Sequence, residues 1–525
     1  MSAPAPYPDA RAALQQARLL QQQGRLEEAE SATLDLLARA PANAEAWLRL
    51  GLVRMASGRA EAALDPFSRA IATQPSAVAH TNLGNALRAL GRHDDAIGSY
   101  DQALALKPDH IVALYNRGNA LRDLKRHEAA LAAYDRVLAL EPLHARALNN
   151  RGAVLRILKR YAEAVATYDR ALSVEPDNAG LHNNRGNALL ALRRHEDALA
   201  SYERALELKP DHAGAHWNEG LCRLLLGDLA GGWRKYEWRW QRATFSSGRR
   251  DFDPPQWRGD QPLEGKTILL HAEQGLGDTM QFCRYASLVA ERGGTVLLEV
   301  QSPLKALLQG LPGVTQVLAK GEPLPDFDFH CPLLSLPLAF DTQIETVPAA
   351  TPYLQAPAQR ASYWHQRLGP ATAPRVGLVW SGQPKHRNDH NRSMALSALL
   401  PLLRLPYQFV SLQKEVRATD LDVLQRQDRI LNLGVELADF SDTAGLVDTL
   451  DLVIAVDTSV AHLAGALGKP VWLLLPFNPD WRWLLHRDDS PWYPTARLFR
   501  QPATGDWAAV VHQVAARLGT TPLRP

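Results

Sequence analysis

The sequence has little cysteine, no long apolar run and almost no excess of charge. Its 525 residues include only Cys222, Cys283 and Cys331, whose spacing fits neither a disulfide framework nor a set of metal ligands. The 58 lysines and arginines nearly balance the 56 aspartates and glutamates, so overall charge indicates no nucleic-acid partner. No apolar run reaches the roughly 18 residues of a membrane span, and no signal peptide is evident, so we expect a cytoplasmic protein.

The N-terminal half is dominated by an internal repeat of 34 residues. Glycine, alanine, tyrosine and proline recur at this interval, for example Gly118, Gly152 and Gly186 with Tyr134 and Tyr168. The pattern resembles the tetratricopeptide repeat, which implies helix pairs stacked into a solenoid with a concave surface. We expect an array over residues 10–246. Its seven units are 10–43, 44–76, 77–110, 111–144, 145–178, 179–212 and a divergent 213–246.

A column of asparagines follows the same period. These residues stand two positions before the repeated glycines, and they are Asn82, Asn116, Asn150, Asn184 and Asn218. The column resembles the one in O-linked N-acetylglucosamine transferases, which implies that it binds the backbone of an extended protein acceptor through carboxamide donors and acceptors. The alternative is that these asparagines bridge adjacent repeats and contact no ligand.

The C-terminal half alternates apolar strands with helices, which predicts parallel sheets. A linker at 247–265 precedes a first lobe at 266–373, which includes a Pro- and Ala-rich connection, and a second lobe at 374–520. The expected strands lie near 267–271, 295–300, 314–318, 327–334, 376–380, 408–412, 430–433, 452–456 and 471–475. Two such lobes resemble a GT-B glycosyltransferase unit. The expected fold class is therefore an α-solenoid followed by a two-lobed, Rossmann-like GT-B unit.

A short glycine turn follows the first strand of the first lobe. Its sequence, Gly275-Leu276-Gly277-Asp278, resembles the motif that opens the bacterial heptosyltransferases. The resemblance implies that Asp278 is the general base for the acceptor hydroxyl and that Gly275 and Gly277 lie at the donor. The alternative is that Asp278 only caps the following helix. His271 and Glu273 are other candidates for the base.

A strand, a polar turn and a small-residue helix at 451–475 form the second motif. Asp457, Thr458, Ser459 and His462 match the donor-binding element of the same heptosyltransferase family, which implies that this turn holds the diphosphate and ribose of a nucleotide sugar. Because a carboxylate repels an anion, Asp457 is expected to orient the turn or to meet a sugar hydroxyl. A helix N-terminus at the carboxyl end of a parallel strand suits an anion. The alternative is an ordinary βαβ unit with a capped helix.

Two further segments follow predicted strands, and both carry cations. The candidate donor-binding residues here are Ser381, Lys385, Arg387, Arg392, Gln413 and Lys414. The alternative for 380–393 is a solvated basic loop. The segment 476–501, with Trp481, Trp483 and Trp492, is predicted mainly to seal the junction between the lobes.

Together these motifs predict a glycosyltransferase that moves a sugar from a nucleotide sugar to serine or threonine hydroxyls of a protein held by the repeats. The architecture resembles that of bacterial proteins that glycosylate flagellins, which implies flagellin as one candidate acceptor among several. We expect no metal and no cofactor beyond the nucleotide-sugar co-substrate. The alternative is a non-catalytic tetratricopeptide scaffold with a degenerate nucleotide-binding unit. The sugar, the nucleotide, the acceptor and the stereochemistry of transfer are left open.

Overall fold

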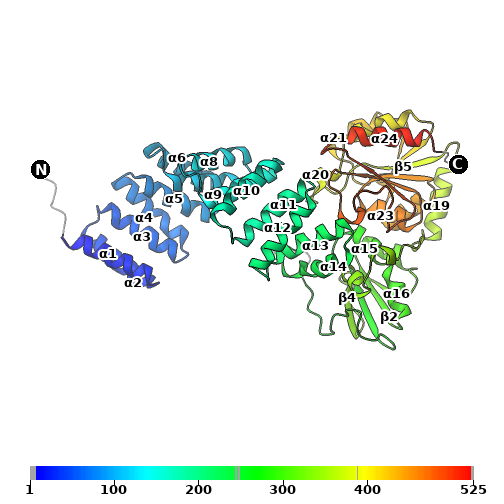
Figure 1. The fold of residues 1–525 in the computed structure, drawn as a ribbon, viewed down its shortest axis with the longest axis horizontal. Coiled ribbons are helices and arrows are strands. Elements are labelled where there is room, and N and C mark those ends of the chain that lie inside the picture. The colour runs from blue at the N-terminus through cyan, green and yellow to red at the C-terminus, as the bar shows by residue number, and fades with distance from the viewer. Residues whose placement is uncertain (1–7, 243–244, 246–248, 387, 522–525) are drawn as a thin grey trace. The chain divides into compact units, whose positions relative to one another are not determined.

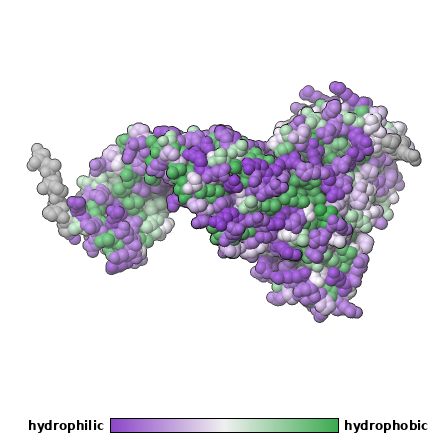
Figure 2. All heavy atoms as spheres, viewed as in Figure 1, coloured by the Kyte–Doolittle hydropathy of each residue, from purple (hydrophilic) through white to green (hydrophobic). Residues whose placement is uncertain are grey.

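The structure is a computed structural model that describes residues 8–242, 245, 249–386 and 388–521. The chain forms two compact units that divide between Pro210 and Asp211 (Figure 1). Among the helices of the described ranges, none is long and apolar enough to cross a membrane. On the face drawn in Figure 2, hydrophilic side chains surround scattered apolar ones.

The described part of the first unit consists of helices in sequential pairs, as the repeat predicts. The pairs are α1 (Pro8–Gln22) with α2 (Leu26–Arg39), α3 (Ala44–Ala56) with α4 (Ala60–Thr73), α5 (Ala77–Ala89) with α6 (His93–Leu106), α7 (Ile111–Asp123) with α8 (His127–Leu140), α9 (Ala145–Ile157) with α10 (Tyr161–Val174), and α11 (Ala179–Ala191) with α12 (His195–Leu208).

The repeated glycine and tyrosine explain how each pair packs. A Cβ atom on Gly152 would lie 2.7 Å from the ring of Tyr168, so only glycine lets the second helix approach this closely. Both residues are fully or almost fully buried. The way in which the helices begin is also repeated. The side chains of His144 and Asn178 accept hydrogen bonds from backbone N–H groups in the first turns of α9 and α11.

The seventh helical pair, α13 (Ala213–Leu226) and α14 (Leu229–Tyr236), belongs to the second unit. It continues into the 3₁₀ helix η1 (Glu237–Gln241). Trp233 of α14 is almost fully buried and contacts Trp481 edge-on at 5.1 Å between ring centroids. An aromatic contact therefore joins the last helical pair to the α/β part.

The segment predicted as a linker packs against the first sheet where it is described. Trp257 is fully buried, and its backbone N–H donates to the carbonyl of His330 at 2.8 Å. Arg250 forms an ion pair with Glu299. Residues 246–248 lie outside the described ranges.

The first sheet has four parallel strands in the order β3-β2-β1-β4. They are β1 (Thr267–His271), β2 (Thr295–Val300), β3 (Val314–Ala319) and β4 (Phe329–Pro332), which confirms the predicted strands. The helix that follows the glycine turn begins within it, at Leu276, and it is interrupted at Cys283 and Arg284. Its two parts are α15 (Leu276–Phe282) and α16 (Tyr285–Glu291), followed by η2 (Ser302–Leu304), α17 (Lys305–Leu308), η3 (Leu333–Ser335), α18 (Leu336–Ala339) and η4 (Ile344–Thr346).

The second sheet has six parallel strands in the order β10-β9-β8-β5-β6-β7. They are β5 (Arg375–Val379), β6 (Gln408–Ser411), β7 (Ile430–Asn432), β8 (Leu452–Val456), β9 (Val471–Leu475) and β10 (Ala496–Arg500). Five of these were predicted, and β10 was not. The helical elements are α19 (Ala358–Leu368), α20 (Asp389–Arg392), η5 (Leu396–Arg404), α21 (Ala418–Gln425), η6 (Gly434–Glu436), α22 (Phe440–Asp448), α23 (Ser459–Ala466), η7 (Trp481–Trp483) and α24 (Trp507–Leu518).

Helical elements cover the central strands of this sheet, which explains their continuous apolar sequences. Every residue of β5, β8 and β9 is buried. Alternate residues of β8, such as Ile454, share one core with η5 and α24. The carboxyl ends of β5 and β8, which are neighbours in the sheet, therefore open onto one common edge.

Candidate functional site

The glycine turn of the first lobe and the helix of the second motif are in direct contact. A Cβ atom on Gly277 in α15 would lie 2.8 Å from Cδ2 of His462 and 3.5 Å from Cα of Ser459 in α23. Even a methyl group would collide there, so glycine is required for this approach. The two motifs, which are about 180 residues apart in sequence, are therefore in contact.

Asp278 lies in the first turn of α15, and both of its carboxylate oxygens have partners. One oxygen accepts the backbone N–H of Gly275 at 2.8 Å, which is the capping role named above as the alternative. The other oxygen forms an ion pair with the guanidinium of Arg482. The side chain of Asp278 is 19% exposed, so it is not sealed from solvent.

Arg482 is the residue that the motif analysis did not assign to the site. It comes from η7, is buried, and donates to Gln281 at 2.6 Å and to Asp480 at 2.8 Å as well as to Asp278. Although burial opposes it, the carboxylates of Asp480 and Asp278 raise the pKa of Arg482 above its ordinary value. No repeat or motif signals this residue, because its partners are distant in sequence.

Asp457 and His462 lie side by side at the start of α23. Burial and the carboxylate of Asp480 raise the pKa of Asp457 to about 6, against the opposing charges of Arg392 and Arg482. Burial, together with nearby arginines, lowers the pKa of His462 well below its ordinary value, so its ring is neutral at pH 7. The ring bonds to the Tyr493 hydroxyl at 2.9 Å through Nδ1, and its Nε2 lies 3.9 Å from the Asp457 carboxylate.

Three buried polar atoms next to this pair have no hydrogen-bond partner among the described residues. They are Ser381 Oγ after β5, Thr458 Oγ1 after β8, and Arg392 Nε. Arg392 reaches across this edge of the sheet, since its Nη1 donates to the backbone carbonyl of Asp457 at 3.0 Å. Leaving such an atom unpaired costs about 1–3 kcal/mol, so a bound polar group here would gain that energy.

The remaining predicted donor residues differ in what they contact. Gln413 uses its amide to bond both backbone groups of Ser381, at 3.2 and 3.0 Å, and so holds the loop that follows β5. The Nζ of Lys414 donates to the carbonyl of Ala438 at 2.6 Å. Lys385 is exposed, whereas Arg387 lies outside the described residues. Their roles toward a donor stay predictions.

The asparagine column makes bonds between neighbouring repeats. Asn116 donates to Asn85 at 2.8 Å, and Asn150 donates to Asn119 at the same distance. Asn184 likewise donates to Asn149 at 3.1 Å. This geometry is the bridging alternative, but the side chains are only half-buried, and acceptor binding stays a prediction.

The two ends of the column differ from its middle. Asn82 donates to the carbonyl of Val78 in its own helix at 2.9 Å. Asn218 lies in α13 and is therefore part of the second unit.

The two other candidates for the base make different contacts. His271 pairs with His330 at 3.2 Å between ring nitrogens, and burial lowers its pKa to about 3. Glu273 accepts two bonds from the buried Arg239, while burial raises its pKa to about 7. Within the described ranges, no group of three or more His, Cys, Asp or Glu side chains is arranged to hold a metal ion.

Comparison with known proteins defines the class of the N-terminal part. Residues 7–78 and 115–180, residues 75–141 and residues 179–212 match sequence models of the tetratricopeptide repeat. Residues 7–212 thus contain tetratricopeptide repeats, and two parallel sheets follow them.

A curated relative extends beyond the repeats. The chain is 27% identical over 326 residues to Protein FlbA of Caulobacter vibrioides. The aligned region covers 56% of this chain and 53% of that protein. The chain therefore spans about half the length of the curated relative that it matches.

Solved structures resemble parts of the chain. YrrB, a TPR protein with an unusual peptide-binding site, is 21% identical, with a TM-score of 0.32 over 35% of this chain and 95% of that one. A tetratricopeptide repeat protein from Parabacteroides merdae is 19% identical, with a TM-score of 0.37 over 43% of this chain and 91% of that one.

Proposed function

We propose that the protein is a GT-B glycosyltransferase that transfers a sugar from a nucleotide sugar to serine or threonine hydroxyls of a protein acceptor. One observation carries the proposal. The unpaired atoms of Ser381, Thr458 and Arg392 gather at the carboxyl ends of two neighbouring parallel strands, where α/β sheets bind nucleotides. A diphosphate oxygen would supply the partners that these atoms lack.

The charges around this edge suit a leaving diphosphate. Arg392 would donate to it, and Lys385 would approach from the exposed part of the same loop. The N-terminus of α23 adds backbone N–H groups, since Thr458 makes no side-chain cap bond there. Cations and amides placed in this way stabilise the charge that develops on the leaving group.

Asp278 would act from the facing lobe. In the proposed step its carboxylate accepts the hydroxyl proton, the hydroxyl oxygen bonds to the anomeric carbon, and the bond from that carbon to the diphosphate breaks. Arg482 and the Gly275 N–H hold the carboxylate in one orientation. Gly277 allows the turn to approach α23, so acceptor side and donor side can meet.

Donor hydrolysis tests the catalytic part. The full chain is incubated with a panel of nucleotide sugars, and release of nucleotide is measured. Asp278→Asn should lower the rate by about 10²–10⁴-fold, because general-base catalysis is lost. Asp422→Asn, at an exposed carboxylate in α21, is the matched control and should not change the rate. No release from any donor, or full activity in Asp278→Asn, would contradict the proposal.

The acceptor part is tested separately, with flagellin as the first probe. Replacing Asn116, Asn150 and Asn184 together by alanine should weaken acceptor binding but leave acceptor-free donor hydrolysis unchanged. Far-UV circular dichroism must show that the array remains folded, because the bonds between repeats are lost as well. Unchanged acceptor affinity in a folded variant would limit the asparagines to a structural role.

A non-catalytic scaffold is the second candidate function. The tetratricopeptide repeats indicate binding to a protein partner. The observation that favours a scaffold is that both oxygens of Asp278 already have partners within the protein. In that case nucleotides would bind at Ser381 and Thr458 without turnover, and Asp278→Asn would change neither nucleotide binding nor partner capture.

A further inference from the structure

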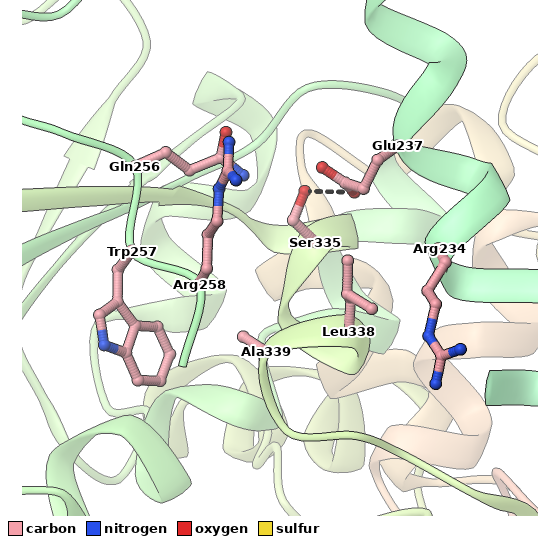
Figure 3. Close-up of a pocket in the computed structure, with 8 residues that line it drawn as sticks. All are labelled: Arg234, Glu237, Gln256, Trp257, Arg258, Ser335, Leu338 and Ala339. Carbon is pink, nitrogen blue, oxygen red and sulfur yellow. Dashed lines mark hydrogen bonds between the residues drawn. The ribbon is translucent and has the colours of Figure 1, made fainter. Parts of the chain in front are cut away.

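A separate cavity lies between the last helical pair and the first sheet (Figure 3). Its volume is about 260 Å³. It is lined by Arg234, Glu237, Gln256, Trp257, Arg258, Ser335, Leu338 and Ala339. A second cavity of about 210 Å³ shares Glu237, Gln256 and Arg258 with it and adds Trp238, Trp240, Gln241 and Arg249. None of these residues belongs to the predicted donor or acceptor set.

The charge of the lining is mostly positive. Arg234, Arg249 and Arg258 are exposed, and no ion pair joins any of them to a carboxylate in the described part of the chain. Glu237 is the one lining carboxylate, and it already accepts bonds from Arg239 and from Ser335. Figure 3 shows Arg234 and Arg258 on different segments, with Ser335 and Leu338 between them. The guanidinium groups of Arg234 and Arg258 line the first cavity and Arg249 lines the second, and such donors suit an anionic ligand.

The walls of the cavity are held in place by buried contacts. The indole N–H of Trp257 donates to the carbonyl of Gln261 at 2.9 Å. Gly259, which has a φ of +96°, lies so close to Ala339 that a Cβ atom would be 2.0 Å from its carbonyl oxygen. Arg239, which is fully buried, donates to Ser335 at 2.7 Å behind the cavity. The site is therefore preformed, which lowers the cost of binding.

The walls also connect to the turn that carries Asp278. Arg239 bonds Glu273, which follows β1. The amide of Gln274, the next residue, donates to the hydroxyl of Tyr236 at 2.9 Å. A ligand in the cavity would thus lie against the same helical pair that supports the loop from β1 to α15.

We propose that this cavity binds an acidic side chain of a polypeptide partner. Its size is below the roughly 300–1,000 Å³ of pockets that enclose a whole small-molecule ligand, but it is sufficient for one side chain and its backbone. Leu338, Ala339 and Trp257 offer apolar contact to the stem of that side chain. The inference rests on the proposed function in one respect: if the protein is a glycosyltransferase, the partner is its acceptor, and the acceptor carries an acidic residue near its modified hydroxyl.

Peptide binding to the full chain tests the inference. The probe is a short labelled peptide in which glutamates flank a serine, and its twin carries glutamines instead. Fluorescence anisotropy should show about tenfold tighter binding of the glutamate peptide. Arg234→Gln and Arg258→Gln should each remove that preference and leave the glutamine peptide unaffected. Arg426→Gln, at an exposed arginine of the other lobe, is the matched control and should keep the preference.

Three results would overturn the inference. They are equal binding of both peptides, an equal loss in Arg426→Gln, and capture of inorganic phosphate at Arg258 without any preference for the glutamate peptide. Acceptor-free nucleotide release is measured on the same variants and should not change. The two proposals can therefore fail independently. A preference for the glutamate peptide without nucleotide release from any donor contradicts only the proposed glycosyltransferase activity.

Discussion

The repeat array and the α/β unit are built from bonds of very different reach. In the array, Tyr134 bonds Asn119 within one helix pair, and Asn150 bonds the same carboxamide from the next repeat. In the α/β unit, Arg482 and Asp278 are 204 residues apart and come from different lobes. Hydrogen bonds between residues close in sequence recur in each repeat, so stability is distributed along the array. The candidate site depends instead on single contacts between residues far apart in sequence.

The largest expected effect comes from breaking the long-range contact. Arg482→Gln leaves the carboxylates of Asp278 and Asp480, whose side chains are 19% and 35% exposed, without their shared buried cation, and it should lower the free energy of unfolding by about 2–3 kcal/mol. Tryptophan fluorescence during urea unfolding reports on this unit, because Trp47 is the only one of the 13 tryptophans that precedes residue 211.

The matching change in the array should be much smaller. Arg151→Gln removes an ion pair with Asp135, whose side chain is 49% exposed, so the loss should be at most about 1 kcal/mol, read by far-UV circular dichroism. Equal losses in the two variants would show that long-range and repeated ion pairs contribute alike.

A second prediction concerns the dependence of stability on pH in the α/β unit. The pKa of Asp457 is about 6 in the folded chain and about 4 when unfolded, so the unfolded chain loses the proton first as pH rises. Stability should therefore fall by about 1–3 kcal/mol between about pH 4 and pH 6, relative to Asp457→Asn. Urea unfolding at a series of pH values measures the difference. Asp422→Asn, at an exposed site, should keep the slope of the unmodified chain.

Two glycine substitutions in the array should have small effects of opposite sign. Gly152→Ala places a methyl group against Tyr168, and it should destabilise the array by about 1–2 kcal/mol. Gly98 lies in the exposed part of α6, and a Cβ atom added there would have no described atom outside its own helix backbone within 4 Å. Gly98→Ala should therefore stabilise the array by about 0.5–1 kcal/mol, because alanine is the better helix former. Thermal unfolding followed by circular dichroism measures both. A stabilising Gly152→Ala would show that the helices can separate without cost.

Most strands were predicted because their apolar runs lie in buried parallel sheets. The exception, β10, carries Arg497 and Arg500 and forms an edge of the second sheet, so its sequence lacks the continuous apolar run of β8 or β9. Residues 275–278 were predicted as a glycine turn and not as the first turn of α15, since Gly275 and Gly277 are weak helix formers. Contact with α23 and the cap by Asp278 stabilise that turn instead.

The sequence by itself determined the repeat, the strands and the two motifs, because periodicity and apolar runs are local properties of the chain. Tertiary structure alone decided that Arg482 pairs with Asp278 and that Gly277 touches His462. It also decided that the hydroxyls of Ser381 and Thr458, at one edge of a sheet, find no partner among the described residues. The arginine-lined cavity was likewise decided by the fold. These features join segments that are far apart in sequence, and packing, which leaves no periodic trace in the sequence, sets where they meet.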